Sequence, residues 1–318
     1  LAGAREASPD ATVAGGGVSM AAGVEAIASS RGVAAMDQAT RLDAGASVIL
    51  SWGDGDGTAA TWDSRGTHTG ELDARAVGRT AADKAVRLAD PQPFSSGKRD
   101  VLFAPDAFGE LLHGIVVGAL MGDDVSRSRS VWADRMGDRV AHGGLSLWDD
   151  PRHAKGLGTT ASDDEGLATR RLPLLEAGRV ATFLYDSWDA HEHGAAASPC
   201  ALRGSFKALP RAGTHHLVLE HANTRPADDL VADVEQGLLV DSILGAHTAN
   251  PTTGDFSVTA PNAWLIEGGQ IVGAAQESAI AGNLPRLLEG LDAVGDDARP
   301  AGGGLLPTVR LRDVGVAV

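Results

Sequence analysis

Cysteine is almost missing from this chain: among its 318 residues, only Cys200 carries a thiol. A single cysteine cannot form an intramolecular disulfide, so disulfide-stapled folds are excluded and a reducing compartment fits. The sequence also lacks any run of about 18 apolar residues, the length that a membrane helix needs. At the start of the chain, no basic region precedes an apolar run and a cleavage site, as it would in a secretory signal. We therefore expect a cytoplasmic protein that does not enter a membrane.

Basic residues are also scarce, and lysine most of all. The chain has 27 Lys and Arg against 42 Asp and Glu, a net charge of -15, and only 4 of the basic residues are Lys. A surface this negative repels phosphate backbones, so direct binding of nucleic acid is not expected. The excess of Asp suits the acidic surface of a protein from a salty cytoplasm, and a high-GC genome would produce the same bias.

The remaining composition is that of a packed globular protein, with 43% hydrophobic and 22% charged residues. The length suffices for two ordinary cores. Residues that break helices and strands cluster in Asp90-Pro91-Gln92-Pro93 and continue through Ser95-Ser96-Gly97. We place a domain boundary there, between Ala89 and Lys98, which divides the chain into residues 1–95 and 96–318.

The first domain is predicted to be an antiparallel meander followed by a helix. The Asp-Gly repeats of Asp54-Gly55-Asp56-Gly57 favour a hairpin turn over a calcium loop, because the further oxygen ligands of an EF-hand are missing. The apolar spacing over Glu71–Leu88 predicts an amphipathic helix. The strands are expected at Val33–Met36, Ala46–Trp52 and Thr58–Trp62.

In the second domain, Pro105 is predicted to start a helix that reaches about Met121. Its apolar residues leave almost no polar face, so it should be buried centrally. The elements lack the regular strand–helix alternation of a Rossmann fold, which indicates an α+β fold. The others expected are a strand at Asp100–Ala104, hairpins at 172–184 and 264–272, helices over Pro226–Gln236 and Leu284–Leu291, and a terminal strand at Leu305–Leu311.

Several segments of the second domain match one protein family in order and spacing. They are SRSRSVWADRMGDRVAHGGLSLWDD (126–150), PRHAKGL (151–157), DDEG (163–166), LPLLEAGRVATFLYDSWDA (172–190), NPTTGDFS (250–257), WLIEGG (264–269) and IAGNL (280–284). With these segments the chain resembles the TldD/PmbA family of peptidase-related proteins, also called modulators of DNA gyrase, and its PmbA-like branch in particular. The first 95 residues resemble the later part of the family's N-terminal domain. We expect the beginning of that domain to be absent, since the chain starts at Leu1 without a methionine.

The resemblance implies a two-domain α+β protein whose C-terminal half is a curved, barrel-like mixed sheet with a buried helix. It also implies dimers that enclose a cavity. Catalytic TldD-like members are zinc peptidases that degrade small or unfolded peptides, and they pair with PmbA-like subunits that lack the metal. The effect on DNA gyrase would be indirect here, given the acidic charge.

The residues that the resemblance assigns to zinc are largely missing from this chain. The catalytic branch carries H-E-x-x-x-H on the buried helix, and the corresponding residues here are His113, Gly114 and Gly118. The family's late cysteine ligand falls near Ala301. One imidazole cannot hold a catalytic zinc, which needs three protein ligands. A vestigial site remains conceivable at His113 with Glu110, which share a helix face at i and i+3, although a buried structural histidine is the simpler interpretation.

Other groups of potential ligands have simpler structural interpretations. His191-Glu192-His193 fits a solvated helix end before Gly194, and Cys200 fits a buried, idle thiol. His215-His216 opens a strand, where successive side chains face opposite ways and cannot easily share one ion. Asp163-Asp164-Glu165 offers oxygen ligands for calcium or magnesium, but acidic loops are expected in a chain of this charge.

The residues and the resemblance leave two functions open. In the first, the chain is a non-catalytic PmbA-like subunit that binds peptide and carries no cofactor, and its partner, a TldD-like subunit in a dimer, supplies the zinc; self-association is the other arrangement. In the second, the chain is itself a metallopeptidase or another hydrolase with a non-standard site. No catalytic residue is assigned, because three of the four family positions lack the expected residue.

Overall fold

The molecule has two main hydrophobic cores. We describe it from a computed structural model of residues 1–318 except 56, 69 and 206. One core lies between Ala4 and Ala85, and the larger one between Val101 and Val316. The α+β class is confirmed, with 21% helix and 43% strand. The position of the domain boundary stays a prediction. None of the described helices has the length and apolar character to cross a membrane.

The first domain is an antiparallel three-stranded sheet with helices on one side. Its elements are α1 (Ala2–Ala7), β1 (Thr12–Ala28), β2 (Ala34–Trp52), the 3-10 turn η1 (Gly53–Gly55), β3 (Gly57–Thr67) and α2 (Ala74–Arg87). The predicted meander is therefore present, and β2 and β3 pair down to Trp52 and Gly57. The expected turn at 54–57 includes Asp56, which lies outside the described residues.

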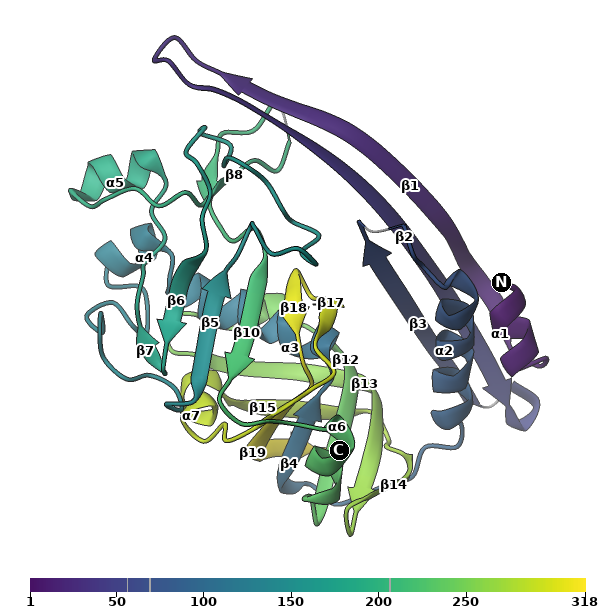
Figure 1. The fold of residues 1–318 in the computed structure, drawn as a ribbon. Helices are drawn as coiled ribbons and strands as arrows, with labels where there is room; N and C mark the ends of the chain where they lie inside the picture. Colours follow the sequence, from purple (N-terminus) through teal and green to yellow (C-terminus); the bar gives the residue numbers. More distant parts are fainter. Residues whose placement is uncertain (56, 69, 206) are drawn as a thin grey trace.

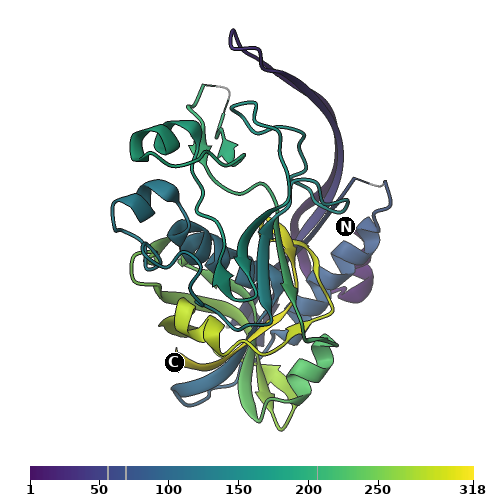
Figure 2. The same ribbon diagram turned by 60° about the vertical axis from the view of Figure 1, so that its left-hand side comes forward.

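β1 and β2 are far longer than the sequence pattern suggested, and their outer parts form an arm, defined here as residues 16–44. The two strands pair from Thr12–Ile49 to Ala28–Ala34. Most of β1 is exposed on both faces, so the arm has no buried face to produce an apolar–polar alternation. Figures 1 and 2 show the arm curving away from α2 and over the C-terminal domain.

α2 is the amphipathic helix that the sequence predicted. Asp73 caps its first turn by accepting a hydrogen bond from the Ala76 amide at 2.9 Å. Its buried face, which includes Val77, Ala81 and Ala85, packs against the sheet.

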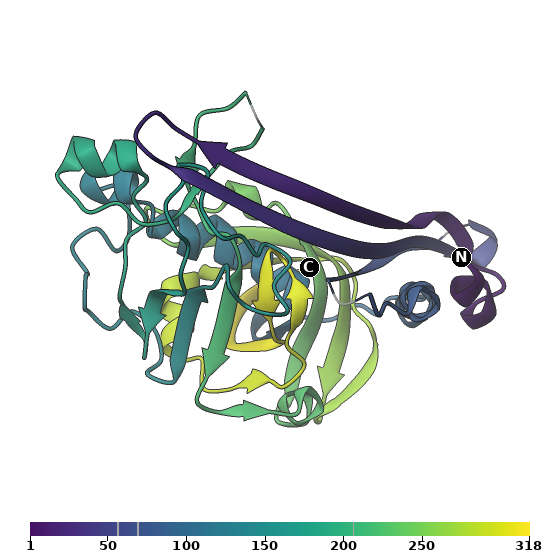
Figure 3. The same ribbon diagram turned by 45° about the horizontal axis from the view of Figure 1, so that its top comes forward.

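The C-terminal domain contains a closed barrel of five strands, as the resemblance implied. The strands are β4 (Gly97–Phe103), β12 (Gln236–Leu244), β13 (Asp255–Glu267), β15 (Ser278–Asn283) and β19 (Val309–Ala317). β12 is parallel to β4 and the other pairs are antiparallel, and pairing of β19 with β4 closes the ring. Figure 3 looks onto this barrel with the arm lying across it.

A second sheet stands beside the barrel, and the predicted buried helix lies between the two. The sheet contains β17 (Arg299–Ala301), β18 (Gly304–Leu306), β10 (Leu217–His221), β5 (Leu145–Asp149), β6 (Leu172–Glu176) and β7 (Arg179–Val180). The helix starts at Pro105 as α3 (Pro105–Leu111) and continues as a π-helical segment, η2 (Leu112–Val117). Leu112, Ile115 and Val116 are buried, as expected.

Two of the predicted elements have different limits in the structure. The helix expected over Pro226–Gln236 is only α6 (Ala227–Ala232), and Gly237 lies in β12 instead of ending a helix. A Cβ at Gly237 would lie 2.4 Å from the Asp100 carbonyl oxygen, so the glycine allows close pairing with β4. The terminal strand is divided into β18 and β19 by Pro307 and Thr308.

The shorter elements complete the domain. The hairpin at 264–272 is β13 with β14 (Gln270–Ala274), and Gly268 and Gly269 both have positive φ in its two-residue turn. The hairpin at 172–184 is present, but β7 spans only two residues. The others are α4 (Gly122–Ser126), α5 (Ser187–His193), β8 (Ala201–Leu202), β9 (Arg211–Ala212), β11 (Thr224–Arg225), η3 (Ala246–Thr248), α7 (Leu284–Glu289) and β16 (Val294–Gly295).

Candidate functional site

The only imidazole of the buried helix lies under the turn between β17 and β18. A Cβ placed on Gly303 would be 2.5 Å from His113 Nε2, which leaves room for glycine alone. Burial lowers the pKa of His113, while a hydrogen bond to the Gly302 backbone and the charge of Asp149 oppose that shift. His113 is therefore a neutral, packed side chain near neutral pH.

The same turn is held against the start of α3 by Asp106. Its carboxylate accepts a hydrogen bond from the Gly302 amide at 3.2 Å and one from Arg299 at 2.8 Å. A Cβ on Gly109 would lie 2.7 Å from the Gly302 Cα, so helix and turn meet backbone to backbone. Ala301, where the resemblance places a cysteine, is in this turn, close in space to the buried helix.

The two helix positions expected to carry Glu and His in a zinc site are occupied by neighbouring chain. A Cβ on Gly114 would lie 2.9 Å from the Ala246 carbonyl oxygen, and one on Gly118 would lie 3.0 Å from Pro251 Cβ. The segment 246–251 therefore fills the space that longer side chains would need.

The residues present do not fit a catalytic zinc. The Glu110 side chain is exposed. Its pKa is nevertheless raised, first by the partial loss of solvent around the carboxyl group and then by the nearby charge of Asp106. Among the described residues, no three or more His, Cys, Asp or Glu side chains are arranged to hold a metal ion. His113 and Glu110 thus lack the further ligands that a catalytic zinc requires.

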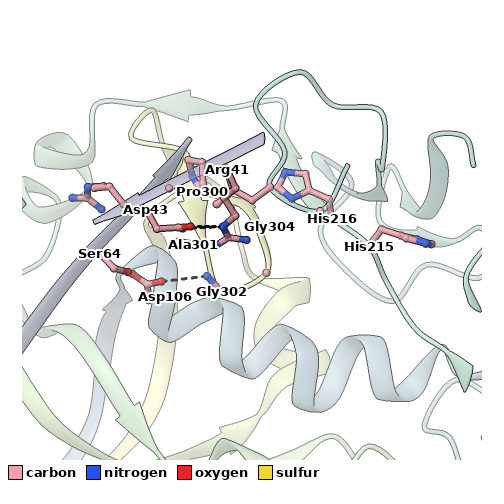
Figure 4. Close-up of a pocket in the computed structure, with 15 residues that line it drawn as sticks. Arg41, Asp43, Ser64, Asp106, His215, His216, Pro300, Ala301, Gly302 and Gly304 are labelled. Carbon is pink, nitrogen blue, oxygen red and sulfur yellow. Dashed lines mark hydrogen bonds and ion pairs between the residues drawn. The ribbon is translucent and has the colours of Figure 1, made fainter. Parts of the chain in front are cut away.

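A central cavity of about 320 Å³ lies above the β17–β18 turn, between the two domains. Arg41 and Asp43 of β2 enter it as an ion pair with 2.7 Å between Nε and Oδ2. Figure 4 shows this pair facing Ala301, and Asp106 reaching Gly302 from below. The first domain thus supplies one wall, which the second-domain motifs alone did not reveal. The remaining wall residues are Ser64, Arg65, Gly66, Leu157, Gly158, His215, His216, Pro300 and Gly302–Gly304.

His215 and His216 precede β10, and their rings point to different sides of the chain in Figure 4, as their alternation predicted. Asp149, which is 1% exposed, fixes this corner. Its Oδ1 accepts the backbone amides of both histidines at 2.8 Å, and its Oδ2 lies 3.2 Å from His215 Nδ1. Burial, followed by the influence of His153, lowers the pKa of His216 to about 4. The sequence contains Asp149 within a family segment, but nothing in it linked that residue to the histidines.

Three further cavities continue from the central one beneath the arm, and we call the four together the arm groove. The next, of about 250 Å³, shares Gly158 and His215 with the central cavity. It shares Glu25, Asp163 and Asp164 with a cavity of about 670 Å³ near the end of the arm. A cavity of about 340 Å³ lies beside them, between Asp37–Thr40 of the arm and residues 151–154.

The other candidates from the sequence have structural roles. Asp163 accepts hydrogen bonds from the amides of Glu165, Leu167 and Ala201, so its carboxylate organises the loop. Burial raises the pKa of the Cys200 thiol to about 12, which makes it unreactive at neutral pH.

His191-Glu192-His193 ends α5 before Gly194, which has positive φ. His193 contacts Asp123 at 3.1 Å, and Glu192 pairs with Arg127 at 3.0 Å. These side chains make surface contacts between α4 and α5 instead of sharing an ion.

Comparison with known proteins decides the family. A model described as the PmbA/TldA metallopeptidase C-terminal domain matches residues 96–318, and the central domain of the same family matches residues 1–89. The chain belongs to the TldD/PmbA family. Metalloprotease PmbA of Escherichia coli O157:H7 is 27% identical over 240 residues, which are 74% of this chain and 50% of that protein. The curated relatives that the chain matches are longer, and the alignments span about half to 60% of their length.

Solved TldD/PmbA structures have the same fold. TldE from Thermococcus kodakarensis superposes with a TM-score of 0.91 at 26% identity, covering 99% of this chain and 71% of that one. A Thermotoga maritima protein named for modulation of DNA gyrase gives a TM-score of 0.86 at 24% identity, covering 99% of this chain and 72% of that one. At that identity the second likeness concerns the fold alone.

Proposed function

We propose that this chain acts as the PmbA-like, non-catalytic subunit of a TldD/PmbA-type peptidase complex, in which a TldD-like partner supplies the zinc. The observation that carries this proposal is the packing around the buried helix. Gly114 and Gly118 stand where the resemblance requires Glu and His, and Ala246 and Pro251 lie too close for longer side chains. Restoring the ligands would therefore require movement of the segment 246–251.

The arm groove supports a role in binding peptide. Neighbouring cavities share lining residues and follow one another beneath the arm, and they are lined by glycines and polar side chains, which suits an extended chain more than a compact ligand. Peptide bound there would reach the β17–β18 turn, next to the place where a catalytic relative would carry its metal. The name metalloprotease, which several of the relatives carry, agrees with action on peptides.

The arm supports association with a second subunit. β1 is an edge strand of 17 residues, and among its exposed side chains are Val18, Met20 and Val24. Met36 of β2 adds to this apolar surface at 63% exposure. A long exposed edge strand with apolar side chains readily pairs with another chain. We propose a TldD-like subunit as the occupant, with self-association as the alternative arrangement.

The experiment compares the purified chain with the same chain co-expressed with an H-E-x-x-x-H relative. We expect the chain alone to contain well under one zinc per chain and to show no chelator-sensitive peptidase activity. His113→Ala should change neither result, and His247→Ala, at an exposed histidine, serves as the control. Light scattering should show a dimer for the co-expressed pair.

Stoichiometric zinc in the chain alone, with chelator-sensitive cleavage abolished by His113→Ala, would overturn the non-catalytic role. A monomer under both conditions would contradict the partner assignment.

A further inference from the structure

We propose that the acidic cavity, the 250 Å³ part of the arm groove between Glu25 and His215, binds the amino-terminal ammonium group of a peptide, with His215 Nε2 as a hydrogen-bond acceptor. This inference rests on the proposed peptide-binding function and names the end of the peptide that enters this cavity.

The orientation of His215 is fixed from behind by Asp149. A carboxylate oxygen can only accept, so the 3.2 Å contact between Asp149 Oδ2 and His215 Nδ1 places a hydrogen on Nδ1. The two amides that Asp149 Oδ1 also binds prevent the carboxylate from turning away. A histidine held in this way presents Nε2 as a lone pair, the arrangement by which proteins orient an accepting imidazole.

His215 Nε2 has no partner among the described residues. The side chain is only 3% exposed, and Nε2 is buried without a hydrogen bond. A buried polar atom without a partner is costly, so a ligand that donates a hydrogen bond there would be bound favourably. His215 also borders the acidic cavity, so the proposal requires that a donor entering the cavity displaces the atoms that cover Nε2.

The charge of the cavity selects a cationic donor. Its described lining contains the carboxylates of Glu25, Asp163 and Asp164 and no Lys or Arg. The Asp163 and Asp164 carboxylates accept backbone amides, which fixes their positions while their negative charge remains. Thr159, Thr160, Ser162 and Thr214 also line the cavity, and a hydroxyl oxygen can accept a further N–H bond of an ammonium group.

The size and connections of the cavity fit a chain terminus. About 250 Å³ accommodates the first residue or two of a peptide but not a long segment. The cavity shares lining residues with the two larger cavities on either side of it, so the following residues of the peptide could extend towards either one. A free carboxylate, by contrast, would be repelled by the three acidic side chains.

The test is calorimetric titration of the full chain with tetra-alanine amide that has a free amino group, and with its N-acetylated counterpart. We expect the free amine to bind about tenfold more tightly or better, the effect of one charge-assisted hydrogen bond. His215→Asn keeps an N–H that can face Asp149 but removes the Nε2 acceptor, so it should weaken this preference, while the carboxylates of the cavity still favour the free amine. His247→Asn, at the exposed histidine, should retain it.

Nitrogen NMR of the histidine rings tests the wild-type chain directly and does not depend on a variant folding. His215 should give the neutral Nδ1–H pattern, and its Nε2 signal should shift with the free amine but not with the acetylated peptide. Equal binding of the two peptides, or an unchanged preference in His215→Asn, would overturn the assignment while leaving peptide binding intact. Failure of both peptides to bind would overturn the proposed peptide-binding function itself.

Discussion

Single residues around the buried helix decide whether this chain could carry a metal. Gly114 and Gly118 stand where the resemblance places two ligand side chains, and the segment 246–251 fills the space beside them. The sequence revealed the missing side chains because the neighbouring motifs fixed the alignment. It could not reveal that the space had been filled, because the filling segment is remote in the chain and nothing in its sequence relates it to the helix.

Gly114→Ala tests that filling. In an open helix position, Ala is more stabilising than Gly by about 1 kcal/mol. Here the new Cβ would lie 2.9 Å from the Ala246 carbonyl oxygen, so we expect a net loss of about 1–3 kcal/mol, as for overpacking. Urea unfolding of the two proteins measures the difference. A gain in stability would show that segment 246–251 moves aside easily, and that a glutamate could be accommodated.

The lowered pKa of the buried His216 predicts that the folded state becomes less stable in acid. Its pKa is lowered from 6.5 to about 4 in the folded chain, mainly by burial. Above pH 6.5 both the folded and the unfolded forms are neutral. As the pH falls from 6.5 towards 4, the unfolded state gains the proton first, so the folded state loses up to roughly 3 kcal/mol.

The measurement is the urea midpoint at pH 7.5 and pH 5 for the wild type and for His216→Gln. The variant should lose less stability on acidification than the wild type, and His247→Gln should behave like the wild type. Equal acid sensitivity in the wild type and His216→Gln would contradict the assignment.

Whole elements differ in how well local sequence specifies them. The start of α3 was predictable because Pro105 fits a first helical position and the apolar residues run without interruption. The π-helical segment was not, since a single wider turn hardly changes the apolar pattern. The length of the arm was underestimated because its Gly- and Ala-rich strands are mostly exposed and show no apolar–polar alternation. The prediction for α6 ended too late because Gly237 resembles the glycine that ends a helix. In the structure, Gly237 instead allows β12 and β4 to pair closely.

Leu112→Ala tests the packing of the buried helix as an element. Leu112 is 2% exposed within the larger core, so its truncation should reduce the free energy of unfolding by roughly 2–5 kcal/mol. Chemical denaturation followed by circular dichroism gives the value. Val86→Ala on the exposed face of α2, where the side chain is 47% exposed, should cost far less. A loss below about 1 kcal/mol at Leu112 would show that the helix is peripheral.

At the scale of the whole molecule, a charged contact fastens the first domain to the barrel. Lys84 of α2 reaches Asp241 of β12 with 2.7 Å between Nζ and Oδ1, and both side chains are largely buried. Trp264 of β13 adds a hydrogen bond to the Arg87 carbonyl at 3.2 Å. Neither contact was foreseeable, because each joins residues that no sequence pattern relates. The arm has a contact of its own with the second domain, a hydrogen bond of 2.7 Å from the Ala161 amide to Asp37.

Removal of one partner of the Lys84–Asp241 pair should lower the free energy of unfolding more than removal of both. Asp241→Ala leaves the buried Lys84 ammonium group with only its longer 3.7 Å contact to Asp63, and we expect a loss of roughly 3 kcal/mol. The double variant Lys84→Met with Asp241→Leu should lose much less, since the remaining buried carboxylate, Asp63, keeps Arg65 at 3.4 Å. Thermal unfolding of the three proteins makes the comparison, and a double variant as unstable as Asp241→Ala would contradict that expectation.

The pairing of β19 with β4 has a consequence for biosynthesis. β4 is synthesised early in the second domain. Its partner β19 follows only near the end of that domain, so Phe103 cannot pair with Val309 until nearly all of the domain has been translated. Until then the nascent barrel has open strand edges, which are prone to pair wrongly, and its closure depends on contacts remote in sequence. We infer that barrel closure comes late in folding, and that the incomplete barrel would benefit from a chaperone that shields β4.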